Sequence, residues 1–145
     1  MANNENFEVC VRGVIMDWGK ILVARNKAKK YYFFPGGHVE FGEKLTETLS
    51  RELKEELGIK PKSSKFIGIV DNVFEDEGIH HEIDFVFEVK TGKIWAESRE
   101  DHIDFEFFDL RQFSKAKVYP LALRKALLKW MKDKKIFQVS QYREK

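Results

Sequence analysis

The sequence predicts a layered α/β sandwich built around a mixed β-sheet. Apolar, β-branched and aromatic residues gather in short runs separated by turn residues, which is typical of strands. Two other segments, which begin at Leu45 and Pro120, repeat their apolar residues every three or four positions, the spacing of an amphipathic helix. Strands together with two well-separated helices bury their apolar faces best in layers.

The first part of the chain reads as a β-hairpin and a short aromatic strand. Residues 7–16 are apolar and β-branched, residues 17–20 form a turn, and residues 21–25 return as a second strand. Residues 31–34 are aromatic and end at Pro35-Gly36-Gly37. Glycines in such a turn can bring the backbone close to a ligand.

The first helix has a clear apolar stripe and a clear end. Leucines stand at positions 45, 49, 53 and 57. Gly58 is expected to form a left-handed C-cap, and Lys60-Pro61 cannot easily continue the helix.

The second part of the chain predicts more strands and a second helix. Residues 65–74 and 82–89 read as an antiparallel pair around an acidic, histidine-bearing connection at residues 75–81. Residues 103–110 form a further strand. Pro120 begins a helix that runs to about Lys134, with Leu123, Leu127, Trp130 and Met131 on one face.

Composition and length predict one domain over residues 1–145. A chain of this length buries about two-thirds of its unfolded surface, and thirteen Phe and three Trp give the core its bulk. The formal net charge of +2 argues against a protein that wraps a nucleic-acid polymer, whereas small nucleotides remain allowed. A homodimer is left open.

The N-terminal residues and the single cysteine suggest where the protein works. Residues 1–7 lack a basic stretch that leads into an apolar one, and no apolar run approaches the roughly 20 residues of a membrane helix. We therefore expect no membrane partner and a cytoplasmic location. Because Cys10 is the only cysteine, an internal disulfide and a thiolate zinc cluster are ruled out. We expect Cys10 to be a small core residue of the first strand.

Three carboxylates stand where a helix tolerates them poorly. Glu55 and Glu56 fall in the last turn, where each is about 0.3–1 kcal/mol unfavourable because it faces the negative end of the helix dipole. Glu52 lies one turn earlier and adds like-charge repulsion. Glu56 projects beside the leucine stripe, so we expect it to be partly buried. A divalent cation with oxygen ligands would offset these costs together, whereas a solvated acidic helix is the ordinary alternative.

The spacing of these residues extends to a longer pattern. Its nine specified positions are Gly37, Glu43 and then Arg51-Glu52-Leu53-x-Glu55-Glu56-x-Gly58-Ile59. This pattern resembles the signature of the Nudix hydrolases, the MutT-like family, at every specified position. The resemblance implies the α/β/α sandwich of that family and a pyrophosphohydrolase that cleaves the diphosphate linkage of a nucleoside diphosphate joined to another group.

The resemblance also implies a metal site and a catalytic role for several residues. Mg²⁺ or Mn²⁺ would be held by Glu52, Glu55 and Glu56, with the carbonyl oxygen of Gly36 or Gly37 as a further ligand. Glu52 or Glu55 would act as the base on the attacking water. Arg51 would orient Glu43 or Glu55, so Glu43 is a structural partner rather than a ligand.

Residues outside the helix are expected to contribute to substrate binding. The substrate-binding candidates are Arg25, Gly36 and His38. Arg25 could approach the substrate phosphates, although Lys27, Lys29 and Lys30 beside it also read as a solvated basic loop. His38 stands where some relatives carry Lys, so its help to the leaving group is open.

Several other candidates stay unresolved at this level. A further acidic ligand is sought among Glu97, Glu100, Asp101, Asp104 and Glu106, and possible stacking faces for a base are Phe34, Phe74, Phe85, Trp95 and Tyr119. His80-His81-Glu82 looks like a metal cluster, but neighbouring residues on a strand point to opposite faces. These residues are better read as a loop tip that borders the substrate.

Three functions fit the fold that the resemblance implies. The first is a metal-dependent hydrolase of a nucleoside triphosphate, a nucleotide sugar, ADP-ribose or a dinucleoside polyphosphate. The second is a regulator that binds nucleotides without turnover, which a broken Arg-Glu-x-x-Glu-Glu core would favour and this chain does not have. The third, a prenyl diphosphate isomerase, needs an active-site cysteine that Cys10 is poorly placed to supply.

Overall fold

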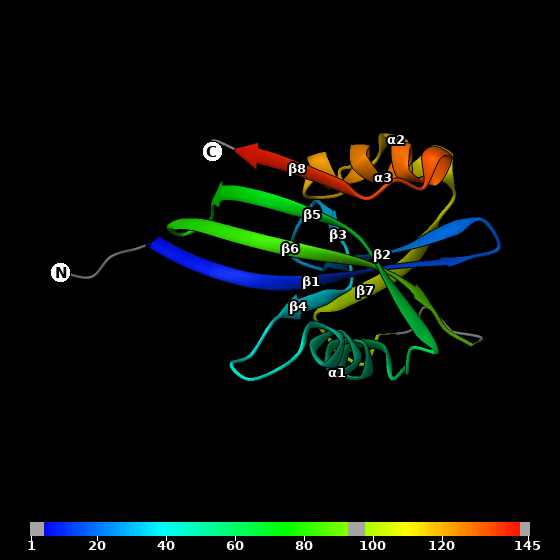
Figure 1. Ribbon diagram of the computed structural model, residues 1–145, viewed down its shortest axis with the longest axis horizontal. Coiled ribbons are helices and arrows are strands. Elements are labelled where there is room, and N and C mark those ends of the chain that lie inside the picture. Colours follow the sequence, from blue (N-terminus) through cyan, green and yellow to red (C-terminus); the bar gives the residue numbers. More distant parts are fainter. Residues whose placement is uncertain (1–4, 93–97, 143–145) are drawn as a thin grey trace.

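The computed structural model describes residues 5–92 and 98–142 of the chain (Figure 1). Its strands are β1 (Glu5–Asp17), β2 (Lys20–Asn26), β3 (Tyr32–Phe33), β4 (Gly36–His38), β5 (Ser63–Glu75), β6 (Ile79–Lys90), β7 (Ile103–Phe108) and β8 (Phe137–Tyr142). Its helices are α1 (Leu45–Leu57), α2 (Leu110–Lys115) and α3 (Leu121–Asp133).

The strands form a mixed sheet in the order β3-β2-β1-β6-β5-β8. β1 pairs with β6 in parallel and β5 pairs with β8 in parallel, whereas β1–β2 and β5–β6 are antiparallel. β4 adds to β1, and β7 adds to β2. The two halves of the chain therefore meet at the pairing of β1 with β6 and at the pairing of β2 with β7.

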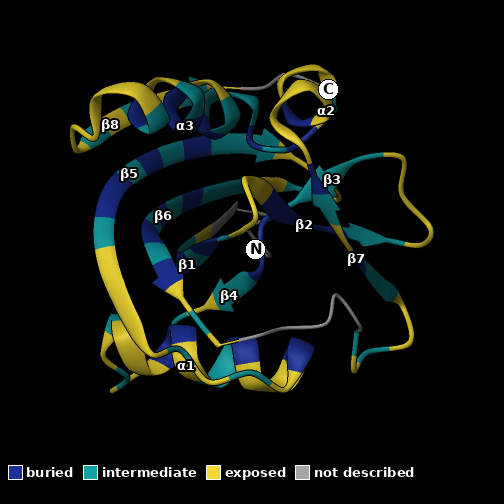
Figure 2. Ribbon diagram, turned by 90° about the vertical axis from the view of Figure 1, so that its right-hand side faces the viewer, coloured by how far each residue is buried: buried dark blue, intermediate teal, exposed yellow. Residues whose placement is uncertain are grey.

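Helices cover the two sides of this sheet, so the predicted α/β/α sandwich is confirmed (Figures 1 and 2). α1 lies on one side, and α2 and α3 lie on the other. One core cluster, which includes Leu49, Leu53 and Phe87, fills the α1 side. The other, which includes Phe34, Phe113 and Trp130, fills the α3 side.

Local signals in the sequence place α1 as predicted. The buried residues of the helix are Thr48, Leu49, Leu53, Glu56 and Leu57, and Figure 2 shows its buried side turned towards the sheet. Gly58 ends the helix with φ of 68°, the left-handed C-cap that was expected.

Several elements were not predicted. The segment Gly36–His38 forms strand β4 instead of continuing a turn, because its backbone pairs with Cys10–Arg12. α2 and β8 were missed, since a helix of six residues and a strand of six residues carry weak periodic signals. Strands β5 and β6 reach to Glu75 and Ile79, so His80 and His81 lie in a strand instead of in the predicted loop tip.

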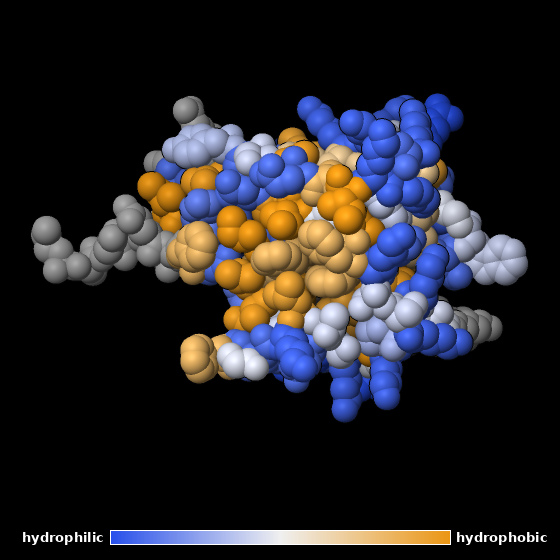
Figure 3. Space-filling view, viewed as in Figure 1, coloured by the Kyte–Doolittle hydropathy of each residue, from blue (hydrophilic) through white to orange (hydrophobic). Residues whose placement is uncertain are grey.

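The apolar character of the sheet extends beyond the part that α1 covers. Val9 pairs with Ile83 and Ile69 pairs with Phe85, so these half-buried side chains share one face. Figure 3 shows apolar side chains gathered over the strands in the centre of this view. Within the residues that the structure describes, no helix is long and apolar enough to cross a membrane.

Removing the central leucine of α1 tests the packing of this layer. Leu53 is fully buried, so Leu53→Ala is expected to lower the free energy of unfolding by about 2–5 kcal/mol in urea titrations. Lys54→Ala changes an exposed neighbour on the same helix and serves as the control. An equal effect of the two substitutions would contradict the packing described here.

Candidate functional site

The C-terminal half of α1 lies against the glycines of β4. The backbone N–H of Gly36 donates a hydrogen bond of 3.0 Å to Oε1 of Glu56. A Cβ atom on Gly37 would lie 2.5 Å from the carboxylate carbon of Glu52, which is closer than real Cβ contacts. Gly36 itself has φ of 138° and would place a Cβ against the carbonyl of Val11. The two glycines therefore allow the helix carboxylates to approach the backbone of the sheet.

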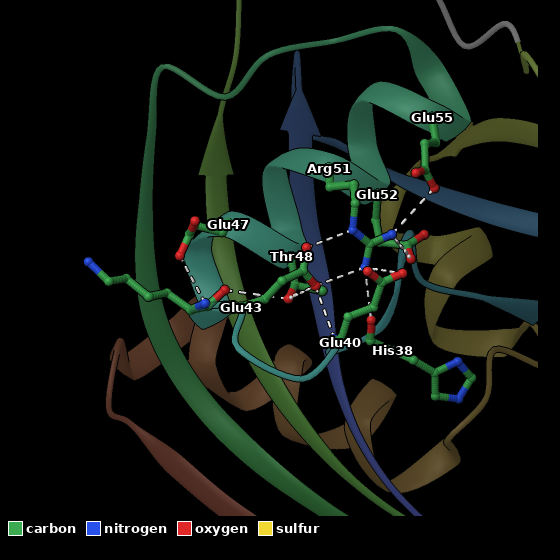
Figure 4. A network of polar contacts seen from close by, with 9 residues as sticks. His38, Glu40, Glu43, Glu47, Thr48, Arg51, Glu52 and Glu55 are labelled. Carbon is green, nitrogen blue, oxygen red and sulfur yellow. Dashed lines mark hydrogen bonds and ion pairs between the residues drawn. The ribbon is translucent and has the colours of Figure 1, made fainter.

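Arg51 joins the carboxylates of this region (Figure 4). Its Nε and Nη2 donate to the two carboxylate oxygens of Glu43 at 2.7 and 3.0 Å. Its Nη1 reaches Glu52 at 3.0 Å and Glu55 at 3.5 Å, and its Nη2 also donates to the carbonyl of His38 at 3.1 Å. The predicted pairing of Arg51 with Glu43 and Glu55 is thus found, with Glu43 the closer partner.

Glu43 is held as a structural anion. Hydrogen bonds from Arg51, from the backbone N–H of Glu40 and from the Thr48 hydroxyl lower its pKa to about 2. This network fixes the loop that precedes α1. Because the fork of Arg51 is engaged by both oxygens of Glu43, much of its charge is already balanced before it reaches Glu52 and Glu55.

The remaining helix carboxylates have unusual environments. Burial raises the pKa of Glu56 to about 8, against the opposing effect of the Gly36 hydrogen bond, and the charge of Glu52 adds to the rise. Glu56 is only 3 % exposed, so the predicted partial burial is confirmed. Burial also raises the pKa of Glu52, although the hydrogen bond from Arg51 opposes it. Glu55 is the most exposed of the three, with 54 % of its side chain accessible.

This arrangement fits a divalent cation. Carboxylate oxygens are the ligands that Mg²⁺ and Mn²⁺ prefer. Glu52 and Glu55 share one guanidinium group, and Glu56 carries a raised pKa because it is buried without an ion-pair partner close enough to offset the burial. A cation between them would supply the missing positive charge, while the exposure of Glu55 leaves access for a substrate.

The other predicted site residues lie at different distances from this centre. Arg25 faces Asp104 at 3.3 Å and lies over the ring of Tyr32, with 43 % of its side chain exposed. His38 faces Glu8 at 2.7 Å and points away from the network of Arg51, as Figure 4 shows. Their predicted contact with substrate phosphates stays a prediction.

The late acidic candidates separate clearly. Glu100 contributes to the raised pKa of Glu56, and the backbone N–H of Arg99 donates to the carbonyl of Glu56 at 2.8 Å. Asp104 is engaged by Arg25 and Lys27. Asp101 and Glu106 are exposed, and Glu97 lies outside the described residues. Among the described acidic candidates, Glu100 in the segment before β7 is therefore the one whose charge affects the pKa of Glu56.

A cavity of about 280 Å³ opens on the other side of the sheet. Its aromatic walls are Tyr31, Phe33, Phe74 and Tyr119, and its polar side chains include Arg12, Asn72 and Glu82. Asn72 is 7 % exposed, and its buried Oδ1 has no hydrogen-bond partner among residues 5–92 and 98–142. Arg12 lines this cavity, and its charge lowers the pKa of Glu56 against the effect of burial, so it links the cavity and Glu56 electrostatically.

Sequence reasoning missed most of the polar residues of this cavity. Arg12 donates to Asp84 and to the carbonyl of Phe34, and Glu82 lies 3.9 Å from its Nη2. The local pattern gave no such signal, because the alternation of Glu82 and Asp84 with Ile83 and Phe85 by itself places the two acids on the solvent side of the strand. Buried charged residues are unusual, and only the packing of the whole sheet reveals them here.

The predicted stacking faces divide into core and cavity. Phe74 and Tyr119 line the cavity, as a base-binding role requires. Phe34 is fully buried against Phe113, so its predicted role as a stacking face is wrong. Phe85 packs beside Phe66 on the α1 side of the sheet, away from the cavity, and Trp95 lies outside the described residues.

Comparisons with known proteins agree with this geometry. A family model described as NUDIX domain matches residues 7–131. The chain is 32 % identical over 126 residues to an ADP-ribose pyrophosphatase of Methanocaldococcus jannaschii. This alignment covers 84 % of this chain and 73 % of that protein. It is 44 % identical over 54 residues to an 8-oxo-dGTP diphosphatase of Buchnera aphidicola, covering 34 % of this chain and 42 % of that protein.

Solved structures show the same fold. A MutT protein from Bacillus halodurans superposes with a TM-score of 0.79 and 20 % identity, over 94 % of this chain and 90 % of that one. A MutT protein from Methanosarcina mazei Go1 gives a TM-score of 0.72 and 23 % identity, over 92 % of this chain and 99 % of that one. At these identities the likeness concerns the fold alone.

The raised pKa of Glu56 predicts how the metal-free protein responds to pH. The folded state binds the Glu56 proton more tightly than the unfolded chain, whose pKa is near 4.5. Stability from this group is therefore complete below pH 4.5 and is lost as pH rises towards about 8. The loss approaches about 1.4 kcal/mol per pH unit at most.

Glu56→Gln removes this dependence, so in EDTA the variant is expected to match or exceed the parent in stability at pH 8. Urea midpoints of both proteins between pH 5 and 8.5 measure the difference in stability. The contributions of ionisable groups that the two proteins share cancel in this difference. A variant that is much less stable than the parent at pH 8 would identify Glu56 as a structural ion-pair partner instead.

Proposed function

The chain belongs to the Nudix hydrolase family, and we propose that it is a Mg²⁺- or Mn²⁺-dependent pyrophosphohydrolase of a nucleoside diphosphate linked to a sugar, with ADP-ribose as the first candidate. Members of this family hydrolyse nucleoside diphosphates linked to another group. The observation that carries the proposal is the convergence of Glu52 and Glu56 on the glycine backbone of β4, with Glu55 joined to Glu52 through Arg51.

The proposed metal ligands are the carboxylates of these three residues, with the carbonyl oxygen of Gly37 as an additional donor. When bound, the ion supplies positive charge to the phosphate oxygens and makes water a better nucleophile. The chain itself must hold the three carboxylates ionised and close together. The Gly36 N–H favours the ionised form of Glu56 against the effect of burial, and Arg51 does the same for Glu52 and pairs with Glu55.

Glu52 or Glu55 is the proposed base. Hydrolysis adds the oxygen of water to one phosphorus, breaks the bridging P–O bond and transfers a proton from water to the base. Glu52 has a raised pKa because of its burial, which suits a group that must accept a proton, while Glu55 is more open to an incoming water. Arg51 keeps either carboxylate in place without touching the substrate.

The proposed place for the nucleoside base is the cavity beside Arg12. Its volume of about 280 Å³ accommodates a planar base, and the rings of Phe74 and Tyr119 offer stacking surfaces. The diphosphate would then extend past Arg12 towards the carboxylates of α1. ADP-ribose is named first because the M. jannaschii protein aligns with most of this chain.

A substrate panel with Mg²⁺ tests the activity. The parent is expected to hydrolyse at least one nucleoside diphosphate derivative, with ADP-ribose, nucleotide sugars, nucleoside triphosphates and dinucleoside polyphosphates compared by phosphate release. Glu52→Gln, Glu55→Gln and Glu56→Gln should each lower kcat/KM by at least about 100-fold, since one lost electrostatic group costs roughly 2.7–4 kcal/mol.

Glu106→Gln is the matched control, because Glu106 is an exposed carboxylate of β7 outside the helix site. Mg²⁺ should also raise the Tm of the parent more than that of Glu56→Gln, by linkage. Tight binding of one nucleotide without turnover of any member of the panel would favour the non-catalytic regulator.

Asn72 tests the place of the base. Its buried Oδ1 has no partner in the described structure, so a donor group on the ligand is expected to complete it. Asn72→Leu should raise KM by roughly 5- to 150-fold, corresponding to about 1–3 kcal/mol, and change kcat little. Asp71→Asn, one position earlier and on the opposite face of β5, is the control. Equal effects of both substitutions would place the base elsewhere.

A further inference from the structure

Four side chains of metal-binding type meet on the sheet, apart from the carboxylates of α1. Glu8 and Cys10 come from β1, His38 from β4 and Glu82 from β6. Their donor atoms all lie within 4.8 Å of one another. The register explains why, because Glu8 pairs with Glu82 and Cys10 pairs with His38, so the four side chains share one face.

The charges around this cluster favour a cation. Glu8, Glu82 and Asp84 supply three carboxyl groups, and Arg12 is the cation that contacts two of them, at 3.9 Å from Glu82 and 3.4 Å from Asp84. Oδ2 of Asp84 is fully buried and, apart from the neighbouring carboxyl group of Glu82, has no hydrogen-bond partner within the described residues. Burial raises the pKa of both Glu82 and Asp84. A second positive charge would relieve this imbalance.

The donor types distinguish this cluster from the helix site. A thiol, an imidazole nitrogen and two carboxylates make up a mixed sulfur, nitrogen and oxygen set, which is typical of Zn²⁺ and similar transition metals. Mg²⁺ prefers oxygen ligands only and would gain little from Cys10. Cys10 is the only cysteine of the sequence, so a site with several thiolates is excluded, whereas a site with one thiolate is not.

The geometry is close to that of a closed site. Bonds of about 2.0–2.3 Å place the donor atoms of a tetrahedral zinc site roughly 3.3–3.8 Å apart, so the widest pair must close by about 1–1.5 Å. The hydrogen bond of 2.7 Å between His38 Nε2 and Glu8 is shorter than this spacing, so an ion that replaces it would move these two donors apart by roughly 0.6 Å or more. Glu8 and His38 also line an open groove of about 540 Å³, which gives an ion a path from solvent.

We propose that Glu8, Cys10, His38 and Glu82 bind a zinc-class transition-metal ion at a site separate from the carboxylates of α1. The sulfur–metal bond forms as the Cys10 thiol loses its proton to solvent. Without the ion, burial holds that proton tightly, because it raises the pKa of the thiol to about 12. Such an ion ties β1, β4 and β6 together.

Cobalt is the probe, because Co²⁺ bound by a thiolate gives a charge-transfer band in the near ultraviolet that oxygen ligands do not give. Cys10 is the only cysteine of the chain, so the band reports this residue alone. The protein, freed of metal with EDTA and then held in excess Mg²⁺, is titrated with Co²⁺. We expect a thiolate band that saturates at one equivalent, shows the visible bands of tetrahedral Co²⁺ and is abolished by Zn²⁺.

Variants separate this site from the helix site. Cys10→Ser should abolish the band, and His38→Ala, at a side chain that is 60 % exposed and so does not test the core, should weaken Co²⁺ binding strongly. His102→Ala, at a similarly exposed histidine, and Glu56→Gln should keep the band. Absence of a thiolate band in the parent would overturn the proposal, as would a band that His38→Ala leaves unchanged.

Discussion

The hydrogen bond from the Gly36 N–H to the Glu56 carboxylate is the contact on which the site depends. It joins the last turn of α1 to β4, and β4 is itself paired with β1 at the centre of the sheet. Burial disfavours the ionised form of this carboxylate, as the rise of its pKa shows. The fold therefore places an energetically unfavourable group where α1 meets β4. A structure that served stability alone would place an apolar residue there.

Charge is divided between two sets of acids around this junction. Glu43 is satisfied by Arg51, by a hydroxyl and by a backbone N–H, and its low pKa keeps it ionised at all working pH values. Glu52 and Glu56 have the opposite tendency, because they are buried with too little positive charge. Glu43 therefore fixes the loop before α1, whereas Glu52 and Glu56 remain able to bind a cation. This division follows from burial, which raises the pKa of Glu52 and Glu56, and from Arg51, whose Nε and Nη2 both go to Glu43.

The local parts of the fold could be predicted from the sequence and the long-range parts could not. The leucine repeat, the Gly58 cap and the burial of Glu56 follow from the periodicity of one helix, and all three are confirmed. The parallel pairing of β1 with β6 joins residues about 74 positions apart, and no local pattern names that partner. For the same reason the carboxylates of α1 were found together, whereas Arg12, Asn72 and Glu82 were not.

This difference also explains why the sequence identifies the family but not the substrate. The helix carboxylates, Arg51 and the glycines of β4 lie within one continuous segment, so a match in sequence transfers their arrangement as a unit. The cavity takes its walls from β1, β2, the segment of Tyr31 and Phe33, β5, β6 and the segment before α3, so no continuous stretch of sequence carries it. Arg12 is the described residue that lines the cavity and acts on Glu56, so a ligand's base and its diphosphate would meet at this side chain.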